Sequence, residues 1–229
     1  MKLGSGIILM LLIVSGTIAL ITPGVASAAT LGCGSKIRTS TVLVADIGPC
    51  SLNGITINTS NIVLNCNGHT IEGTGVGDGI IINSGSIVVE NCKVSGFKYG
   101  FFLHDVTFVN MTGNSASNSK YGFYLKTSNS NLLVKNTAED NSGAGFYMFR
   151  AHYNNLTDNV ALNNAIGFYF NNSSQHNTVA DNSADGSSQY GYQDIAVQRH
   201  PTFQTYEGDE CSGNLLGGSS PTGLCAPQS

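Results

Sequence analysis

The sequence predicts an all-β fold, namely a single-stranded right-handed parallel β-helix (solenoid) of about seven to eight coils with capped ends. Two repeats predict it. A Gly-aromatic motif returns at spacings of 21 to 25 residues, and an Asn column runs in step with it. A third observation excludes repeats built from helices, because no segment shows the apolar spacing of an amphipathic helix.

The chain begins with a segment typical of export. Lys2 precedes a mostly apolar run, Ile7 to Ile21, and small residues follow up to Ala28. This pattern predicts a signal peptide over residues 1–28. The alternative is a retained membrane anchor, but the run is shorter than the roughly 20 residues that a spanning helix needs. We therefore expect no stable membrane insertion after cleavage, and a secreted, extracellular or cell-surface protein.

All six cysteines follow the signal peptide, and an even number in an exported chain indicates disulfides. Residues 29–52 precede the first clean coil and are predicted to form an N-terminal cap. Residues 193–229 break the repeat and are predicted to form a C-terminal cap and tail, with Cys211 paired to Cys225. Spacing leaves open the pairing of the other four, Cys33, Cys50, Cys66 and Cys92.

Residues 53–192 are predicted to form the coils. About 22 residues make one turn of a three-strand coil, and successive coils stack at roughly 4.8 Å. Because equivalent positions stack, the Asn column is expected to form an amide ladder. Its expected members are Asn91, Asn114, Asn136, Asn159 and Asn182.

Side chains alternate across each strand, so the repeat also predicts which residues line the core. Apolar positions that flank the middle aromatic are expected to point inward: Phe101, Leu103, Phe123, Leu125, Phe146, Met148, Phe168 and Phe170. A second inward column is expected at Val88, Met111, Leu133, Leu156 and Val179. Small residues suit a crowded corner of the core: Ala116, Ala138, Ala161 and Ala184. The middle aromatics are predicted to form an outward stripe: Phe102, Tyr124, Tyr147 and Tyr169.

Three segments resemble known β-helix proteins. Residues 64–73, LNCNGHTIEG, resemble the entry coil of pectin-lyase-like right-handed β-helix proteins, and residues 154–159 and 177–182 resemble the Asn-rich repeats of the NosD-like branch. The resemblance covers most of residues 40–225 and implies the same fold. Proteins of this kind include polysaccharide lyases, epimerases, adhesin-like surface proteins and a periplasmic factor for copper-enzyme maturation, so the resemblance leaves function open.

Two pairs of residues are candidates for catalysis. Residues 99–105 resemble a motif of mannuronan epimerases, in which His104 and Asp105 match the last two positions but Phe102 and Leu103 replace an Asp and a Pro. Asp158 and Asp181 fall at equivalent places in adjacent coils, where they could act as acid and base or bind a cation. The alternative for both pairs is an ordinary polar turn, with Lys135 one coil before Asp158.

No cofactor or metal site is identified. Ca²⁺, which enzymes of similar fold often need, has no supporting ligand set in the sequence. Copper would need clustered Met, Cys and His, but Met111 and Met148 fit inward columns and the histidines are dispersed, with only His152 and His176 placed to approach across coils. The net charge of −4 argues against a nucleic-acid partner and disfavours a polyanion.

The outward stripe is the strongest functional candidate. Tyr combines a flat apolar face with a hydroxyl, which suits sugar rings, and exposed apolar strips often mark binding sites. The alternative is a ladder that only stabilises the sheet. We expect a secreted or cell-surface module that is non-catalytic, with a structural role or with a polysaccharide, cell-surface glycan or other surface as partner. The other hypothesis is a polysaccharide lyase, epimerase or glycoside hydrolase with an unrecognised site. The ligand and the oligomeric state stay open.

Overall fold

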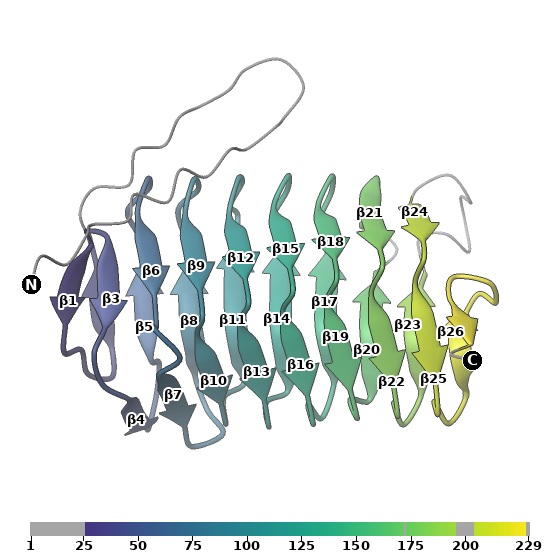
Figure 1. Cartoon of the computed structure of the whole chain (residues 1–229), viewed down its shortest axis with the longest axis horizontal. Helices are drawn as coiled ribbons and strands as arrows, with labels where there is room; N and C mark the ends of the chain where they lie inside the picture. Colours follow the sequence, from purple (N-terminus) through teal and green to yellow (C-terminus); the bar gives the residue numbers. More distant parts are fainter. Residues whose placement is uncertain (1–25, 172, 196–203, 228–229) are drawn as a thin grey trace, which may run out of the picture.

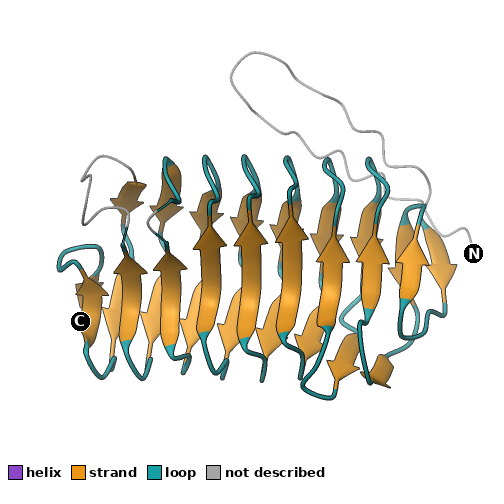
Figure 2. Cartoon of the chain, turned by 180° about the vertical axis from the view of Figure 1, so that it is seen from behind, coloured by secondary structure: helices purple, strands orange, loops and turns teal. Residues whose placement is uncertain are grey.

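The computed structural model describes residues 26–171, 173–195 and 204–227. That part consists of strands and short connections, which stack along one axis into a parallel β-helix (Figures 1 and 2). Three parallel sheets of nine strands each run the length of the stack. The all-β solenoid expected from the sequence is therefore confirmed. Within the described ranges no helix is long and apolar enough to span a membrane.

Sheet 1 carries the Gly-aromatic motif. Its strands, in spatial order, are β2 (Ser35–Ile37), β5 (Ile55–Ile57), β8 (Asp78–Ile82), β11 (Tyr99–His104), β14 (Tyr121–Lys126), β17 (Ala144–Phe149), β20 (Ile166–Phe170), β23 (Tyr190–Asp194) and β26 (Gly217–Ser220).

Sheet 2 follows sheet 1 along each coil. Its strands are β1 (Ser27–Ala29), β3 (Thr41–Leu43), β6 (Val63–Asn65), β9 (Val88–Glu90), β12 (Asn110–Thr112), β15 (Leu132–Val134), β18 (Asn155–Thr157), β21 (Asn177–Ala180) and β24 (Gln204–Glu207).

Sheet 3 completes the coil. Its strands are β4 (Ile47–Cys50), β7 (Thr70–Gly73), β10 (Lys93–Ser95), β13 (Ser115–Ser117), β16 (Thr137–Glu139), β19 (Val160–Leu162), β22 (Ser183–Asp185), β25 (Glu210–Ser212) and β27 (Ala226–Pro227).

The core fills the space between the three sheets, and its columns follow from strand alternation. Phe101, Phe123, Phe146 and Phe168 are fully buried and stack ring on ring at 4.7–4.8 Å. The residues two positions later and the four alanines are also fully buried, as the sequence predicts. One column is shifted: Val89, not Val88, is buried and pairs with Met111, because Val88 pairs with Asn110 and turns its side chain the other way.

Buried amide ladders occupy the three corners of the coil. In each ladder the backbone N–H and the Nδ2 of one Asn donate to the Oδ1 of the Asn in the next coil, as Asn136 does to Asn159 at 2.9 and 3.0 Å. Nδ2 also donates to a backbone carbonyl, so the buried amide is satisfied. The ladder expected from the sequence runs through Asn114, Asn136, Asn159 and Asn182, and the other two include Asn131, Asn154, Asn177, Asn141 and Asn164.

Asn91 was expected to start the first ladder, and this prediction is wrong. Asn91 is exposed with a φ of 55°, whereas Cys92 donates its N–H to the Oδ1 of Asn114 at 3.0 Å. The physical reason is a disulfide between Cys66 and Cys92, which takes the buried corner and leaves Asn91 at the left-handed turn position.

The ends of the stack continue its three sheets. Residues 29–52, predicted as a cap, carry β2, β3 and β4, and residues 193–229 carry β24 to β27. Disulfides join Cys33 to Cys50 at one end and Cys211 to Cys225 at the other. The predicted signal peptide lies outside the described residues except for its last three, of which Ser27 and Ala28 pair with β3.

Candidate functional site

The outward stripe forms the centre of an aromatic face on sheet 1. Phe102, Tyr124, Tyr147 and Tyr169 are half-buried and pair in register across β11, β14, β17 and β20. Their ring centroids lie 5.3, 5.0 and 4.9 Å apart, with interplanar angles of 17°, 13° and 31°. Neighbouring rings therefore cover much of each other's faces, and the outer edges of the rings meet solvent.

A second column of rings widens this face. Tyr99 and Tyr121 pair across β11 and β14, with their rings 5.6 Å apart and nearly parallel. Their planes are turned by 69° and 70° from those of Tyr124 and Tyr147, at centroid distances of 4.8 and 4.9 Å. We define the aromatic face by these six residues, Tyr99, Phe102, Tyr121, Tyr124, Tyr147 and Tyr169. It presents two ring orientations side by side.

The hydroxyls of the aromatic face have no protein partner among the described residues. Two tyrosines near the end of the stack differ: the hydroxyl of partly buried Tyr206 donates to Asp194 at 2.7 Å, and the hydroxyl of buried Tyr192 donates to Asp209 at 3.4 Å. Partial burial, and then neighbouring tyrosines, raise the pKa of Tyr124 to about 12 and also raise the pKa of Tyr147. These hydroxyls therefore stay protonated at neutral pH and can donate hydrogen bonds to a ligand.

Cations lie at the edges of the aromatic face. Lys98 Nζ lies 4.7 Å from the ring centre of Tyr99, and Lys120 Nζ lies 5.2 Å from that of Tyr121. On the other edge, the guanidinium carbon of Arg150 lies 5.4 Å from the ring centre of Phe149. Each distance is short enough for a cation–π contact.

The other two sheets carry different outward residues. In sheet 2 the column facing outward reads Thr112, Val134, Thr157 and Ala180. In sheet 3 the equivalent column reads Ser95, Ser117, Glu139, Leu162 and Asp185. These are ordinary outward residues of a solvated sheet. The aromatic rings are therefore a property of sheet 1 and not of the coil in general.

The first catalytic candidate is an exposed pair at the end of β11. His104 Nε2 lies 3.1 Å from Asp105 Oδ2, with side chains 39% and 58% exposed. Asp105 has a φ of 53°, and His104 pairs with Lys126 of the next strand. The structure thus brings the two residues together. It adds no third carboxylate, cysteine or histidine to form a cluster within the described chain.

The second catalytic candidate is a pair of turn residues. Asp158 and Asp181 are exposed and have φ values of 55° and 54°. Each occupies the same left-handed corner position as Lys135, whose φ is 55°. Asp and Asn tolerate this conformation better than most residues, so turn geometry accounts for both carboxylates. No described ion pair joins Lys135 to Asp158.

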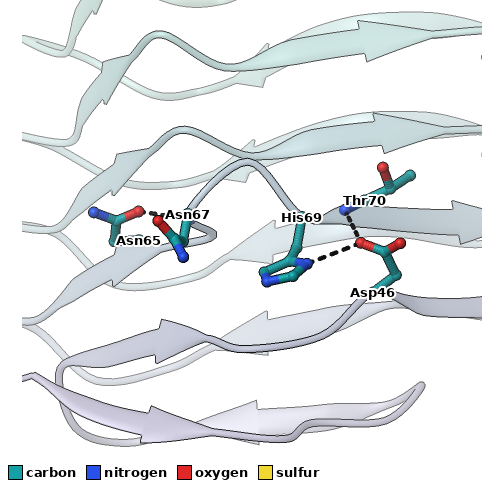
Figure 3. A network of polar contacts seen from close by, with 5 residues as sticks. All are labelled: Asp46, Asn65, Asn67, His69 and Thr70. Atoms are coloured by element: carbon teal, nitrogen blue, oxygen red, sulfur yellow. Dashed lines mark hydrogen bonds and ion pairs between the residues drawn. The ribbon is translucent and has the colours of Figure 1, made fainter.

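The segment that resembles the pectin-lyase-like entry coil builds a polar corner (Figure 3). Asp46 accepts hydrogen bonds from the Thr70 backbone N–H at 2.8 Å and from His69 Nδ1 at 3.1 Å. These two bonds, the backbone one first, lower the pKa of Asp46. Nearby, the N–H of Asn67 donates to Asn65 Oδ1 and supports a left-handed turn at Asn67. The motif therefore serves local structure in this chain.

Possible copper donors are dispersed or already engaged. All six cysteines form disulfides, and Met111 and Met148 are fully buried in the core. His176 acts on His152 electrostatically: burial, and then His176, lower the pKa of His152. The ring of His176 stacks on Tyr153 at 5.0 Å. The described residues contain no group of three metal-ligating His, Cys, Asp or Glu side chains, and His200 lies outside them.

The last complete coil replaces apolar core residues with ionisable ones. Asp194 takes the core position of Phe170, and Tyr206 takes that of Val179. Asp209 ends the first amide ladder by accepting from the N–H and Nδ2 of Asn182, both at 2.9 Å. Its Oδ2 is buried without a partner, and burial raises the pKa of Asp209 to about 6.

A cavity of about 720 Å³ lies near this end of the stack. It is lined mainly by glycine and serine of the last coil, together with the Cys211–Cys225 disulfide and Leu216. Among the described residues no Asp, Glu, His, Lys or Arg lines it, and Tyr190 is its one ionisable lining residue apart from the disulfide cysteines. The aromatic face, which combines several rings with neighbouring cations, is the better candidate.

Sequence reasoning found only the middle column of the aromatic face. It missed Tyr99 and Tyr121, and it did not connect Lys98 and Lys120 with the face. A signal for all four was present: Lys-Tyr-Gly-Phe occurs at residues 98–101 and again at residues 120–123. The Lys and Tyr of this repeat precede the glycine and therefore lie outside the Gly-aromatic motif itself.

Comparisons with known proteins agree with the fold. A family model described as "Periplasmic copper-binding protein (NosD)" matches residues 25–215. Among solved structures the chain is similar to the Dettilon tailspike protein (gp208), with a TM-score of 0.51 and 11% identity over 82% of this chain, which spans 52% of that one. A catalytic domain of a GH87 alpha-1,3-glucanase gives a TM-score of 0.25 and 10% identity, covering 89% of this chain and 63% of that one. No curated protein matches the sequence.

Proposed function

We propose that this chain, which belongs to the NosD family, is an exported, non-catalytic β-helix protein that binds carbohydrate through the aromatic face. The periplasmic description of the family and the three disulfides both support an oxidising compartment outside the cytoplasm. Copper, named in the family description, is not part of this proposal, because the described donors do not cluster.

The observation that carries the proposal is the row of unpartnered hydroxyls on the aromatic face. Each buried tyrosine hydroxyl of the last coil donates to a carboxylate, as a buried polar group must. The five tyrosines of the aromatic face are partly exposed instead, their hydroxyls have no protein partner among the described residues, and they lie one strand apart along each column. An aromatic ladder that served only the sheet could be built from Phe, so the hydroxyls supply chemistry that the sheet does not need.

The arrangement suits a sugar chain that lies along the stack. Ring edges form an apolar strip for the C–H faces of the sugars, and the phenol hydroxyls donate to sugar oxygens. Four coils contribute rings in register, so a linear oligosaccharide can contact several coils at once. Repeated weak contacts along one chain add up, which is how an open surface without a deep pocket can bind.

The test is retention of the mature protein on a panel of neutral and charged polysaccharides in affinity gels. We expect the wild type to be retarded by at least one polymer and the Tyr124→Ala/Tyr147→Ala variant to lose at least about tenfold in affinity, a loss of the size seen when binding side chains are truncated. The matched control is Thr112→Ala/Val134→Ala, which removes outward side chains at adjacent positions on sheet 2.

Folding of each variant is checked by thermal unfolding. Tyr124→Phe/Tyr147→Phe keeps the rings and removes only the hydroxyls, so it separates loss of binding from loss of the ladder. Equal retention of the two alanine variants and the wild type would refute the proposal. So would the absence of retention on every polymer.

A further inference from the structure

The cations beside the aromatic face are not neutralised by ion pairs. Within the described residues the two ion pairs both involve histidine, and no Lys or Arg lies within 4.0 Å of a carboxylate. Lys98 and Lys120 are exposed and occupy equivalent positions in adjacent coils, because the tyrosines that follow them pair in register. Like charges at such positions repel, so an anion between or beside the two ammonium groups would relieve the repulsion.

The two lysines line a groove of about 460 Å³ at the edge of the face. Asn118 and Ser142 also line it, and they supply polar groups without a net charge. Asp140 is the single carboxylate among the lining residues, and it forms no ion pair within 4.0 Å. Asp78, which does not line the groove, lies one coil before Tyr99 and interacts electrostatically with Lys98. Among the residues that line the groove, two lysines accompany one carboxylate, so the lining carries an excess of positive charge.

The charge of the whole chain hides this local excess. Residues 151–229 contain seven Asp or Glu and one Arg, whereas the coils that carry Lys98 and Lys120 are close to balance. Potentials near a surface are set by the charges within about one Debye length, roughly 8–10 Å in ordinary salt. The net charge of −4 therefore does not determine which ligand the groove prefers.

We propose that this groove binds the anionic group of an acidic polysaccharide, carboxylated or sulfated, while the adjacent sugar rings lie on the aromatic face. This inference rests on the proposed function and names its ligand class. Lys98 and Lys120 are placed to contact one acidic group from two successive coils. Their ammonium groups already lie against Tyr99 and Tyr121, so neighbouring side chains would contact the acidic group and the sugar rings of the ligand.

The experiment measures affinity for two matched pairs of polymers. Polygalacturonate is compared with its methyl-esterified form, and dextran sulfate with dextran, each at low and high salt. The proteins are the wild type, Lys98→Ala/Lys120→Ala, Tyr124→Ala/Tyr147→Ala and a charge-matched control. The control, Lys93→Ala/Lys135→Ala, removes two exposed lysines that lie on sheet 3 and at a turn.

We expect the wild type to prefer at least one charged polymer over its neutral partner by about three- to tenfold at low salt, and to lose this preference at high salt. Lys98→Ala/Lys120→Ala should lose the preference and keep its affinity for the neutral polymer, whereas the lysine control should behave as the wild type. A preference for polygalacturonate over its methyl ester would indicate a carboxylated ligand, and a preference for dextran sulfate over dextran would indicate a sulfated one.

Two results would overturn the inference alone: a wild type that binds charged and neutral polymers equally, or a Lys98→Ala/Lys120→Ala variant that keeps the preference. In both cases the proposed function would still be tested separately by Tyr124→Ala/Tyr147→Ala. Undiminished binding of that variant, or no binding of the wild type to any of the four polymers, would overturn the proposed function and the inference with it.

Discussion

Two columns of aromatic rings run along the same strands of sheet 1, one inside the coil and one outside. The inner rings, from Phe101 to Tyr192, are fully buried, lie 4.7–4.8 Å apart and deviate from parallel by only 4° to 8°. The outer rings, from Phe102 to Tyr169, lie 4.9–5.3 Å apart and deviate by 13° to 31°. One residue of alternation separates the two columns.

The difference shows what fixes each column. Inner rings are held from every side, so stacking and close packing leave one arrangement. Outer rings are held by their neighbours along the column and, on one side, by Tyr99 and Tyr121, and their tilt varies. Packing therefore explains why the inner column is Phe in coil after coil, but it does not require Tyr on the outside. The hydroxyls of the outer column must be explained by something that the ring contacts do not provide.

The sharpest test of this comparison removes one ring from each column. Phe146→Ala should lower the free energy of unfolding by about 3–5 kcal/mol, because it opens a cavity between Phe123 and Phe168. Tyr147→Ala, one residue later, should cost about 1–2 kcal/mol, since its ring is half-buried and water replaces it. Urea unfolding followed by circular dichroism measures both. A similar loss for the two variants would show that the outer column is part of the core.

The last coil has ionisable side chains at inner positions where the earlier coils have apolar or amide side chains. Asp209 is one of them, and its carboxyl can titrate. Burial raises the pKa of Asp209 to about 6, above the ordinary value of 3.8. The folded protein thus holds a proton that the unfolded chain releases, so this stabilising contribution is complete below about pH 4 and is lost as the pH rises through about 6. The difference between the two pKa values of Asp209 corresponds to a change of about 3 kcal/mol in the free energy of unfolding.

Asp209→Asn should remove this dependence on pH. The Asn Oδ1 can still accept from Asn182, and its Nδ2 can donate to the Val179 carbonyl, as Asn182 does to Leu156. On going from pH 5 to pH 7.5, the unfolding temperature of the wild type should therefore fall by more than that of Asp209→Asn. Thermal unfolding of both proteins at the two pH values measures this difference. Asp46→Asn is the control, because that carboxyl is exposed and its pKa is lowered. Parallel curves for wild type and Asp209→Asn would contradict the prediction.

Strict columns made most of the fold predictable. Once coils stack in register, identical positions share one environment, so the Gly-aromatic motif and the column at Asn114 placed the strands, the inner rings and one ladder correctly. Errors arose where the period changed by one residue. Counting back 23 residues from Met111 and Asn114 gave Val88 and Asn91, whereas the coil that contains Cys92 is one residue shorter and puts Val89 and Cys92 in those columns.

The candidate site was less predictable, since a surface site depends on which side chains lie next to each other in space and not only on the repeat length of the sequence. Asp158 and Asp181 stood out as paired carboxylates, yet the corner needs a residue with positive φ, which is a backbone requirement. Conversely, Lys-Tyr-Gly-Phe recurs at residues 98–101 and 120–123, but this repeat alone does not place Lys98 and Lys120 beside an aromatic face. The contacts of their ammonium groups with the rings of Tyr99 and Tyr121 are visible only in three dimensions.

The smallest expected effect separates the two kinds of tyrosine hydroxyl. Tyr206→Phe removes a 2.7 Å hydrogen bond to buried Asp194 and should cost about 1.5–3 kcal/mol, the usual range for a bond to a charged group. Tyr124→Phe removes a hydroxyl without a protein partner and should change stability by less than about 0.5 kcal/mol. If thermal unfolding showed a clear loss for Tyr124→Phe, its hydroxyl would belong to the fold. A Tyr124→Phe variant with unchanged stability and weakened retention on polysaccharide would assign the outer hydroxyls to binding, because no other described residue uses them.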